Sequence, residues 1–199
     1  MQGGDGEDIL NGNEDADILL GDEGNDLLYG GSGNDQLQGG VGADILYGEE
    51  NDDVLFGEEG NDLLFGGSGD DQLYGNDGAD ILMGGDGDDL LLPGSGADIM
   101  NGGQGNDIYY YDMGSGIKHL EDDGGYDRLV LRGGINLSSL RLSLGSLMIN
   151  SGTDGDELHL DGVDYSNLSE TSPIDIVEFS NGQAMDMAAV IGLLRRICG

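Results

Sequence analysis

Residues 21–47 read GDEGNDLLYGGSGNDQLQGGVGADILY, which is three copies of a nine-residue unit, G-x-x-G-x-D-x-L-x. The unit extends in both directions without a change of phase, so that twelve copies run from Gly3 to Tyr110. The sixth letter is Asp in all twelve copies, and the eighth is large and apolar in all twelve. A carboxylate and an apolar residue at fixed positions in every copy predict a solenoid with the eighth letters in its core.

Acidic residues are concentrated in this repeat region. Residues 1–110 contain 27 Asp and Glu and no Lys or Arg, whereas all six basic residues lie in residues 111–199. Like charges about 5 Å apart repel by roughly 3 kcal/mol at an effective dielectric constant near 20, and stacked coils bring the sixth letters to about that separation. The region therefore requires bound cations to fold and is otherwise disordered. A formal net charge of −35 disfavours nucleic acid and anionic membranes as partners.

The unit resembles the RTX (repeats-in-toxin) nonapeptide, G-G-x-G-x-D-x-U-x, in which U is a large aliphatic residue and which forms a calcium-binding β-helix. The resemblance covers residues 3–110 and implies an all-β fold, a right-handed parallel β-roll with two parallel sheets. Two units make one coil, so twelve units predict six coils. We divide the chain into this roll and a C-terminal capping region over residues 111–199.

Each unit is predicted to be a turn over its first six letters followed by a three-residue strand. Glycine at letters one, two and four predicts positive φ at those positions. Letter four departs from Gly only at Asp15 and Asn51, two residue types that tolerate the left-handed region.

The capping region is predicted to hold strands over residues 127–131, 140–144, 147–149, 157–160 and 174–179, and a helix over 187–196 with Asp186 as its N-cap. A solenoid needs such a cap to shield its terminal core. The segments DDGGYDRLVLRGGI, LRLS, LMI and IDIVEFSNGQAMDM are similar to the haemolysin-type calcium-binding-related region that follows RTX repeats. The FADG motif of that family corresponds to FSNG at residues 179–182.

The resemblance also implies where Ca²⁺ binds, as a cation that takes six to eight oxygen ligands. Each ion lies between one turn and the corresponding turn two units later. The first turn supplies its Asp and the carbonyls of letters two and four, and the later turn supplies its Asp and the carbonyls of letters one and three. The first such site consists of Gly4, Gly6 and Asp8 with Gly21, Glu23 and Asp26.

Pairing units one to ten with units three to twelve gives about ten Ca²⁺ ions. The carboxylate ligands are Asp8, Asp17, Asp26, Asp35, Asp44, Asp53, Asp62, Asp71, Asp80, Asp89, Asp98 and Asp107. The letter-two carbonyls are those of Gly4, Asn13, Asp22, Gly31, Gly40, Glu49, Glu58, Gly67, Asn76, Gly85 and Gly94. The letter-four carbonyls are those of Gly6, Asp15, Gly24, Gly33, Gly42, Asn51, Gly60, Gly69, Gly78, Gly87 and Gly96. The letter-one carbonyls are those of Gly21, Gly30, Gly39, Gly48, Gly57, Gly66, Gly75, Gly84, Pro93 and Gly102. The letter-three carbonyls are those of Glu23, Ser32, Val41, Glu50, Glu59, Ser68, Asp77, Asp86, Ser95 and Gln104.

An eleventh position, below Gly94, Gly96 and Asp98, lacks a matching carboxylate. Gly116 stands where the sixth letter would fall two units after Asp98, so this end of the repeat is expected to be incomplete. The remaining acids are interpreted as a solvated surface; examples are Glu14, Glu49, Glu58, Asp70 and Asp88.

One sheet is expected to carry apolar side chains on its outer face. These are Ile9, Leu27, Ile45, Leu63, Ile81 and Ile99, beside Tyr29, Tyr47, Phe65 and Met83. Stacking along the sheet is favoured over a docking surface or burial against a neighbouring domain.

Three further residues that often carry chemistry are given structural or incidental roles. His119 and His159 have no metal-ligand spacing, and Cys198, the only cysteine, leaves no internal disulfide. No HExxH, GxSxG or Walker motif occurs, so the chain is not expected to be an enzyme itself. No run of eighteen apolar residues predicts a membrane span.

The sequence favours a secreted, extracellular, monomeric calcium-binding module. Extracellular calcium modules bind at about 10⁻⁴–10⁻³ M, so the chain would stay unfolded in the cell and fold outside it. The resemblance implies export by type I secretion machinery, and the repeat beginning already at Gly3 suggests a fragment of a longer exported protein with an upstream domain. The alternatives are the non-catalytic module of a secreted enzyme (protease, lipase, polysaccharide lyase or epimerase) and an adhesin or toxin segment.

Overall fold

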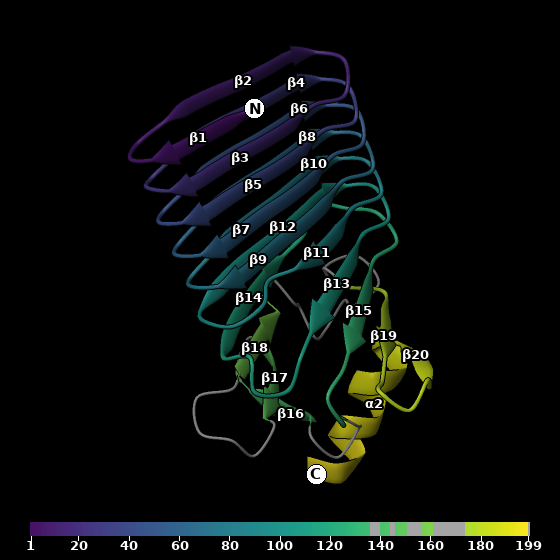
Figure 1. The fold of residues 1–199 in the computed structure, drawn as a ribbon. Helices are drawn as coiled ribbons and strands as arrows, with labels where there is room; N and C mark the ends of the chain where they lie inside the picture. Colours follow the sequence, from purple (N-terminus) through teal and green to yellow (C-terminus); the bar gives the residue numbers. More distant parts are fainter. Residues whose placement is uncertain (136–139, 144–145, 151–156, 161–173, 199) are drawn as a thin grey trace.

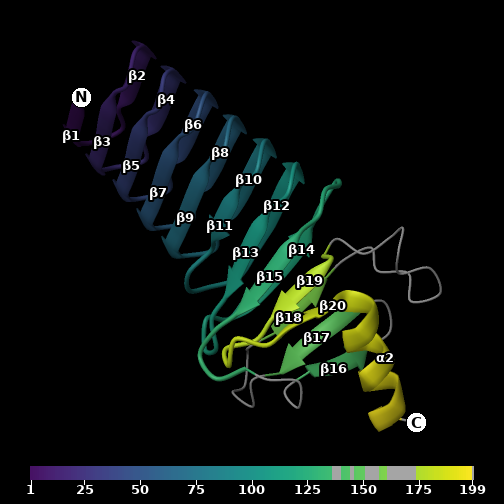
Figure 2. The ribbon, with the colours of Figure 1, turned by 90° about the vertical axis from the view of Figure 1, so that its right-hand side faces the viewer.

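The computed structural model describes residues 1–135, 140–143, 146–150, 157–160 and 174–198. Its strands stack into a rod of two facing sheets, with the N-terminus at one end and helix α2 at the other (Figures 1 and 2). Successive strands of the roll alternate between the sheets, so two strands make one coil. In spatial order, the first sheet consists of β1 (Gln2–Asp5), β3 (Ile18–Glu23), β5 (Gln36–Val41), β7 (Val54–Glu59), β9 (Gln72–Asp77), β11 (Leu90–Leu92), β13 (Ile108–Tyr111), β15 (Arg128–Leu131), β19 (Ile176–Glu178) and β20 (Ala184–Asp186).

The second sheet begins in the cap and ends at the open end of the roll. It consists of β16 (Leu140–Ser143), β17 (Ser146–Asn150), β18 (Glu157–Leu160), β14 (Ile117–Glu121), β12 (Asp98–Gln104), β10 (Ile81–Asp86), β8 (Leu63–Ser68), β6 (Ile45–Glu50), β4 (Leu27–Ser32) and β2 (Ile9–Glu14). Pairing is parallel from β2 through β18 and from β1 through β19, and antiparallel pairs occur only in the cap part of these sheets. The predicted parallel β-solenoid of two sheets is confirmed.

The core is a single file of apolar side chains between the two sheets. The eighth letters from Leu19 to Tyr109 are completely buried, and Leu10 is 9% exposed in the first coil. Each lies in register with the eighth letter one coil away, as Leu46 does with Leu64. One core side chain per strand is little apolar mass for a rod of this length, which leaves much of the stabilisation to the turns.

The turns are shorter than the sequence predicted. Most strands of the roll are six residues long and include letters one to three of the following unit, as in Val54–Glu59. The turn is therefore only letters four to six. The prediction failed because parallel pairing uses backbone groups alone, so Gly-rich segments can join it.

Positive φ occurs at letters two and four of every unit, and not at letter one. The prediction for letter one was therefore wrong, and that glycine has a different role, described below. Asp15 and Asn51 have φ of 72° and 78° at letter four, as expected. Letter two adopts the same conformation even where it is not Gly, at Asn13, Asp22, Glu49, Glu58 and Asn76.

The stack of coils continues past residue 110 into the region predicted to be the cap. Met100 is in register with Leu120, and Tyr109 with Leu129. Residues 113–121 and 122–130 are thus two further nonapeptides, displaced from the phase of the repeat by a two-residue insertion at residues 111–112. Their eighth letters, Leu120 and Leu129, are completely buried. The division of domains at residue 111 stays a prediction.

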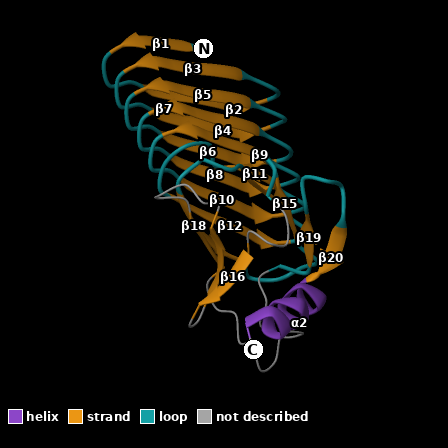
Figure 3. Ribbon diagram, turned by 90° about the horizontal axis from the view of Figure 1, so that it is seen from below, coloured by secondary structure: helices purple, strands orange, loops and turns teal. Residues whose placement is uncertain are grey.

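The cap agrees closely with the predicted elements, except that β14 and β20 were not predicted. The other predicted strands and helix correspond to β15 to β19 and α2 (Met187–Cys198). The N–H of Ala189 donates to Asp186 Oδ1 at 2.6 Å, which confirms the N-cap. Figure 3 shows α2 at the end of the rod, where it contacts β16, β19 and β20. Its residues Val190 and Ile191 are completely buried.

Aromatic side chains stack along the outer faces of both sheets. Tyr29, Tyr47 and Phe65 form a continuous stack with ring centroids 5.2 and 4.9 Å apart, and Phe56 stacks on Tyr74 at 4.7 Å. The predicted stacking along the sheet is therefore present. Within the described part of the chain, no helix has both the length and the apolar character needed to cross a bilayer.

Candidate metal centre

The sixth-letter aspartates form two columns, one along each line of turns. We call Asp8, Asp26, Asp44, Asp62, Asp80 and Asp98 the first ladder, and Asp17, Asp35, Asp53, Asp71, Asp89 and Asp107 the second ladder. Within each ladder, the backbone N–H of one Asp donates to Oδ1 of the Asp in the next coil at 2.7–2.9 Å. One carboxylate oxygen therefore holds the coils in register.

The other oxygen, Oδ2, is buried and lacks a hydrogen-bond donor in most of the ladder. From Asp26 to Asp107 every ladder Asp is at most 3% exposed. Within the part of the chain that the structure describes, no donor reaches Oδ2 of Asp8, Asp26, Asp35, Asp44, Asp53, Asp62, Asp71, Asp80, Asp89 and Asp107. A buried carboxylate without a partner is strongly unfavourable, and such an oxygen recurs in nearly every coil. A cation bound beside each Oδ2 would supply the missing partner.

The surroundings of Oδ2 are those of an oxygen-rich cation site. A Cβ placed on Gly57 would lie 2.5 Å from Asp62 Oδ2 and 2.8 Å from the carbonyl oxygen of Gly75, one coil later. The carboxylate of one turn and the letter-one carbonyl of the next thus converge on the same small space. Letter one is Gly because this space must stay free of side-chain atoms. The sequence had instead predicted that Gly occurs there for its positive φ.

At letters two and four, the backbone of one coil lies directly against the carbonyl oxygens of the coil before it. A Cβ on Gly60 would lie 1.4 Å from the carbonyl oxygen of Gly42, and one on Gly67 would lie 2.3 Å from that of Glu49. The letter-three carbonyls from Glu23 to Gln104, with the exception of Ser32, already accept an N–H from letter four of the preceding coil at 2.6–3.3 Å. A carbonyl oxygen has two lone pairs, so these groups keep one for a ligand.

Desolvation raises the pKa of the ladder carboxyl groups from Asp35 to Asp107, since a buried charge loses its hydration. The pKa rises to about 6 for Asp44 and Asp107, to about 7 for Asp53, Asp71 and Asp80, and to about 8 for Asp89. The hydrogen bond from the preceding backbone N–H opposes the shift, and neighbouring aspartates add to it in these six groups. The metal-free ladders therefore hold protons that a divalent cation would displace.

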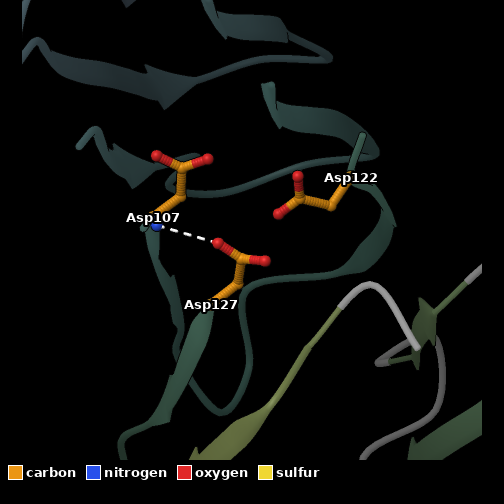
Figure 4. Close-up of side chains that lie close together, drawn as sticks. All are labelled: Asp107, Asp122 and Asp127. Carbon is orange, nitrogen blue, oxygen red and sulfur yellow. Dashed lines mark hydrogen bonds between the residues drawn. The ribbon is translucent and has the colours of Figure 1, made fainter. Parts of the chain in front are cut away.

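The second ladder continues beyond the twelve units, which the sequence reading missed. The N–H of Asp107 donates to Asp127 Oδ1 at 2.9 Å, and the N–H of Asp127 donates to Asp175 Oδ2 at 3.0 Å. Asp122 adds a third carboxylate, and oxygens of Asp107, Asp122 and Asp127 lie within 4.8 Å of one another (Figure 4). The segment DDGGYD at residues 122–127 matches the first six letters of the repeat in its fourth and sixth letters. The match is in phase with the other units only when a two-residue insertion at residues 111–112 is allowed.

The extra carboxylate is oriented by Tyr109, the twelfth core residue. The Tyr109 hydroxyl donates to Asp122 Oδ2 at 2.8 Å and accepts the N–H of Gly102 at 2.6 Å. Burial raises the pKa of Asp122 and raises that of Asp127 to about 7. This end of the second ladder thus resembles the repeat sites and carries one carboxylate more.

The first ladder ends differently, and the expected incomplete site below Asp98 needs a correction. Lys118 Nζ lies 2.7 Å from Asp98 Oδ2, at the position that the missing carboxylate left open. Gly116 is not the counterpart of Asp98 in the structure, because Asp98 is in register with Lys118. The two-residue insertion at residues 111–112 again explains the error.

Two minor interpretations are refined by the structure. His119 and His159, treated as separate, stack with ring centroids 4.8 Å apart, and His159 Nε2 lies 3.1 Å from Glu157 Oε2. Asp70 and Asp88 are exposed, as expected of surface acids, but each Oδ1 also accepts a backbone N–H from the next coil. The side chain of Cys198 lies outside the described part of the chain.

Together, the fold and the buried acidic turns define a class, the parallel β-solenoid with oxygen-lined cation positions between its coils. The family model described as "RTX calcium-binding nonapeptide repeat (4 copies)" matches residues 2–37, 29–64, 56–91, 74–109 and 94–117. These matches span residues 2–117, more than half of the chain, so the chain belongs to this family of calcium-binding repeats.

A solved structure, the extracellular lipase LipA from Serratia marcescens, is similar to the chain with 20% sequence identity and a TM-score of 0.49. The similarity covers 81% of this chain and 37% of that one, so the chain spans well under half of the lipase's length. The comparison with curated proteins gave no match.

Proposed function

We propose that the two ladders bind Ca²⁺ between successive coils through the ligands implied by the family resemblance. The observation that carries this proposal is the repeated buried Oδ2, which faces a letter-one carbonyl of the next coil. A site of carboxylate and carbonyl oxygens without nitrogen or sulfur suits Ca²⁺. Each interior Asp serves the ions on both sides of it.

The proposed number of ions is eleven. Units one to ten paired with units three to twelve supply ten positions, and Asp107 with Asp122 and Asp127 supplies another at the end of the second ladder. This last site gains its extra carboxylate from outside the family match, which ends at residue 117. The sequence alone predicted about ten.

Calcium binding is proposed to drive folding once the chain is outside the cell. Two ladders of closely spaced carboxylates with raised pKa values oppose folding at neutral pH, and divalent cations between the coils offset that opposition. Because extracellular calcium modules bind at about 10⁻⁴–10⁻³ M, the unfolded form would persist inside the cell. The biological role is thus to keep a larger exported protein unfolded for type I secretion and to stabilise it afterwards.

The test is a calcium titration of the whole chain at pH 7.5, followed by circular dichroism, with magnesium as the control. We expect a cooperative change from coil to β-structure with Ca²⁺ and no such change at equal Mg²⁺, because Mg²⁺ demands a rigid octahedral site and gives up its water reluctantly. Equilibrium dialysis then counts the ions. A fully β-structured chain in excess chelator at pH 7.5 would contradict the proposal.

The alternatives named from the sequence concern the parent protein. A catalytic motif in the full-length gene would make the chain the module of a secreted enzyme. Binding of this chain to cells or glycans, lost in the double variant Tyr47→Ser and Phe65→Ser, would favour an adhesin or toxin segment.

A further inference from the structure

The first ladder ends on a cation that belongs to the protein. Residues 113–121 read MGSGIKHLE, which has the pattern of the nonapeptide except that Lys118 stands at the sixth letter. Gly114 and Gly116 at letters two and four have positive φ, as in the other units. Strand β14 is paired in parallel with β12, and Lys118 is in register with Asp98. This unit therefore keeps the backbone of the turn and has a positive side chain at the sixth letter, where the other units have a negative one.

The ammonium group of Lys118 is fully enclosed and has three oxygen neighbours, two as hydrogen-bond acceptors and one as an ion-pair partner. Its Nζ donates to the carbonyl oxygens of Gly96 at 2.9 Å and Ser115 at 2.6 Å, and it lies 2.7 Å from Asp98 Oδ2. The side chains of Lys118 and Asp98 are both 0% exposed. Two of its three N–H groups therefore donate hydrogen bonds, and its charge is paired with Asp98, as a buried lysine requires.

These three oxygens correspond to ligands of a calcium position one coil higher. Gly96 supplies the letter-four carbonyl and Asp98 the carboxylate of the upper turn, while Ser115 supplies the letter-three carbonyl of the lower turn. We propose that Lys118 is a covalently attached counter-cation, which takes the place between units eleven and thirteen that Ca²⁺ takes between the units above. This inference rests on the proposed calcium ladder.

The placement of Lys118 also explains why this ladder can stop. The next strand of the sheet, β18, puts Leu158 in register with Lys118, and Leu158 is completely buried. A divalent ion at this position would have Asp98 as its only ladder carboxylate, whereas one ammonium group neutralises one carboxylate. The first ladder is thus closed without metal at its junction with the cap, while the second ladder passes on through Asp127.

Lys118→Asp tests the proposal directly, because it restores the sixth-letter carboxylate. The expected result is one additional bound Ca²⁺ per chain in equilibrium dialysis, with a cooperative calcium-dependent transition like that of the unaltered protein. Arg132→Met is the matched control, because it removes a nearby cation that is paired with Asp112 outside the ladder. The control should leave the ion count unchanged. A folded Lys118→Asp chain that binds no additional ion would overturn the proposal.

Lys118→Met removes the charge and keeps an unbranched side chain that is one atom shorter. The expected result is a melting temperature at saturating calcium that is lower by roughly 10 °C, because Asp98 loses its buried partner, or else one additional Ca²⁺ that enters the position. An unchanged melting temperature together with an unchanged ion count would refute the proposal.

A measurement on the unaltered protein remains informative if neither variant folds. Lys118 is the only lysine in the chain, so ¹⁵N-lysine labelling produces one ammonium resonance. We expect slowly exchanging ammonium protons in the calcium-loaded form and rapid exchange in chelator. Rapid exchange in both forms would contradict an enclosed ammonium. If the unaltered protein binds no calcium, the proposed function fails; if it does and these results are negative, only the role of Lys118 fails.

Discussion

The two ladders of this roll follow the same repeat up to residue 110, and after that residue they end in opposite ways. The first ladder ends at Lys118, whose ammonium contacts Asp98. The second ladder continues to Asp127 and Asp175 and gains a third carboxylate from Asp122. The comparison teaches that the last turn of the first ladder keeps positive φ at letters two and four, at Gly114 and Gly116, and differs from the repeat in the charge of its sixth letter. Under the proposed function, that charge decides whether a coil junction takes a metal ion.

The largest effect is expected for Asp62→Asn, in the middle of the first ladder. Under the proposed ligand map Asp62 serves the ions on both sides, so its loss should remove two ions and raise the calcium midpoint of folding. Asp8→Asn is the matched variant, because Asp8 begins the ladder and serves one ion. Equilibrium dialysis and circular dichroism check both. Equal ion counts in the two variants would contradict the sharing of each interior carboxylate.

Asp127→Asn probes the continuation of the second ladder beyond the family match. It should remove one ion, because Asp127 completes the site of Asp107 and Asp122 and its Oδ1 also accepts the N–H of Asp107. Asp123→Asn, at an exposed neighbouring acid, is the control and should bind as many ions as the unaltered chain. If both variants bind the full number, the second ladder ends at Asp107.

The dependence of calcium binding on pH should reflect the raised pKa values of the ladder. Between pH 8 and pH 6 protons occupy carboxyl groups such as Asp89, with a pKa of about 8, and Asp71, with a pKa of about 7, so the calcium midpoint should rise as the pH falls. In chelator, where no calcium is bound, the fold should instead become more stable as the pH falls. Groups whose pKa is higher in the fold than in the unfolded chain stabilise the metal-free fold at acid pH, and this contribution is lost as the pH rises through 6 to 8.

Circular dichroism at pH 5 and pH 8, with and without calcium, measures both trends. Metal-free chain should contain more β-structure at pH 5 than at pH 8. A calcium midpoint that does not change between pH 6 and pH 8 would show that protons and calcium do not compete for the ladders.

The smallest effect is expected for Tyr109→Phe, which removes the hydroxyl that orients Asp122. The lost hydrogen bonds to Gly102 and Asp122 should lower the free energy of unfolding in calcium by about 1–2 kcal/mol. Tyr126→Phe is the control, because Tyr126 is 60% exposed. Denaturant unfolding of both variants at saturating calcium makes the comparison, and equal stabilities would remove Tyr109 from the support of this site.

The regular part of the molecule could be predicted because its period is short and exact. Asp at letter six ends the turn, and the apolar residue at letter eight is flanked on the strand by letters seven and nine, so letter eight faces the core while its two neighbours face outward. This reasoning placed Leu19 to Tyr109 in the core and identified the buried ladder aspartates. It also identified Asp15 and Asn51 as residues under the same backbone constraint as glycine.

The errors after residue 110 share one cause, which is that spacing along the chain differs from spacing in the fold. A two-residue insertion hid the units at residues 113–121 and 122–130, and with them Lys118, Asp122 and Asp127. The role of the letter-one glycines was also missed, because the need for empty space beside Gly57 arises only when the next coil brings the carbonyl of Gly75 close.

By itself, the sequence determined the solenoid, its core and the acid in every turn, because these follow from a local pattern that each unit repeats. Tertiary structure alone decided what each carboxylate meets across the coil boundary, since that depends on strand register and not on position along the chain. The difference is physical: a turn within one unit sets the direction of its own side chains, but a buried charge is stabilised or opposed by the coil stacked next to it.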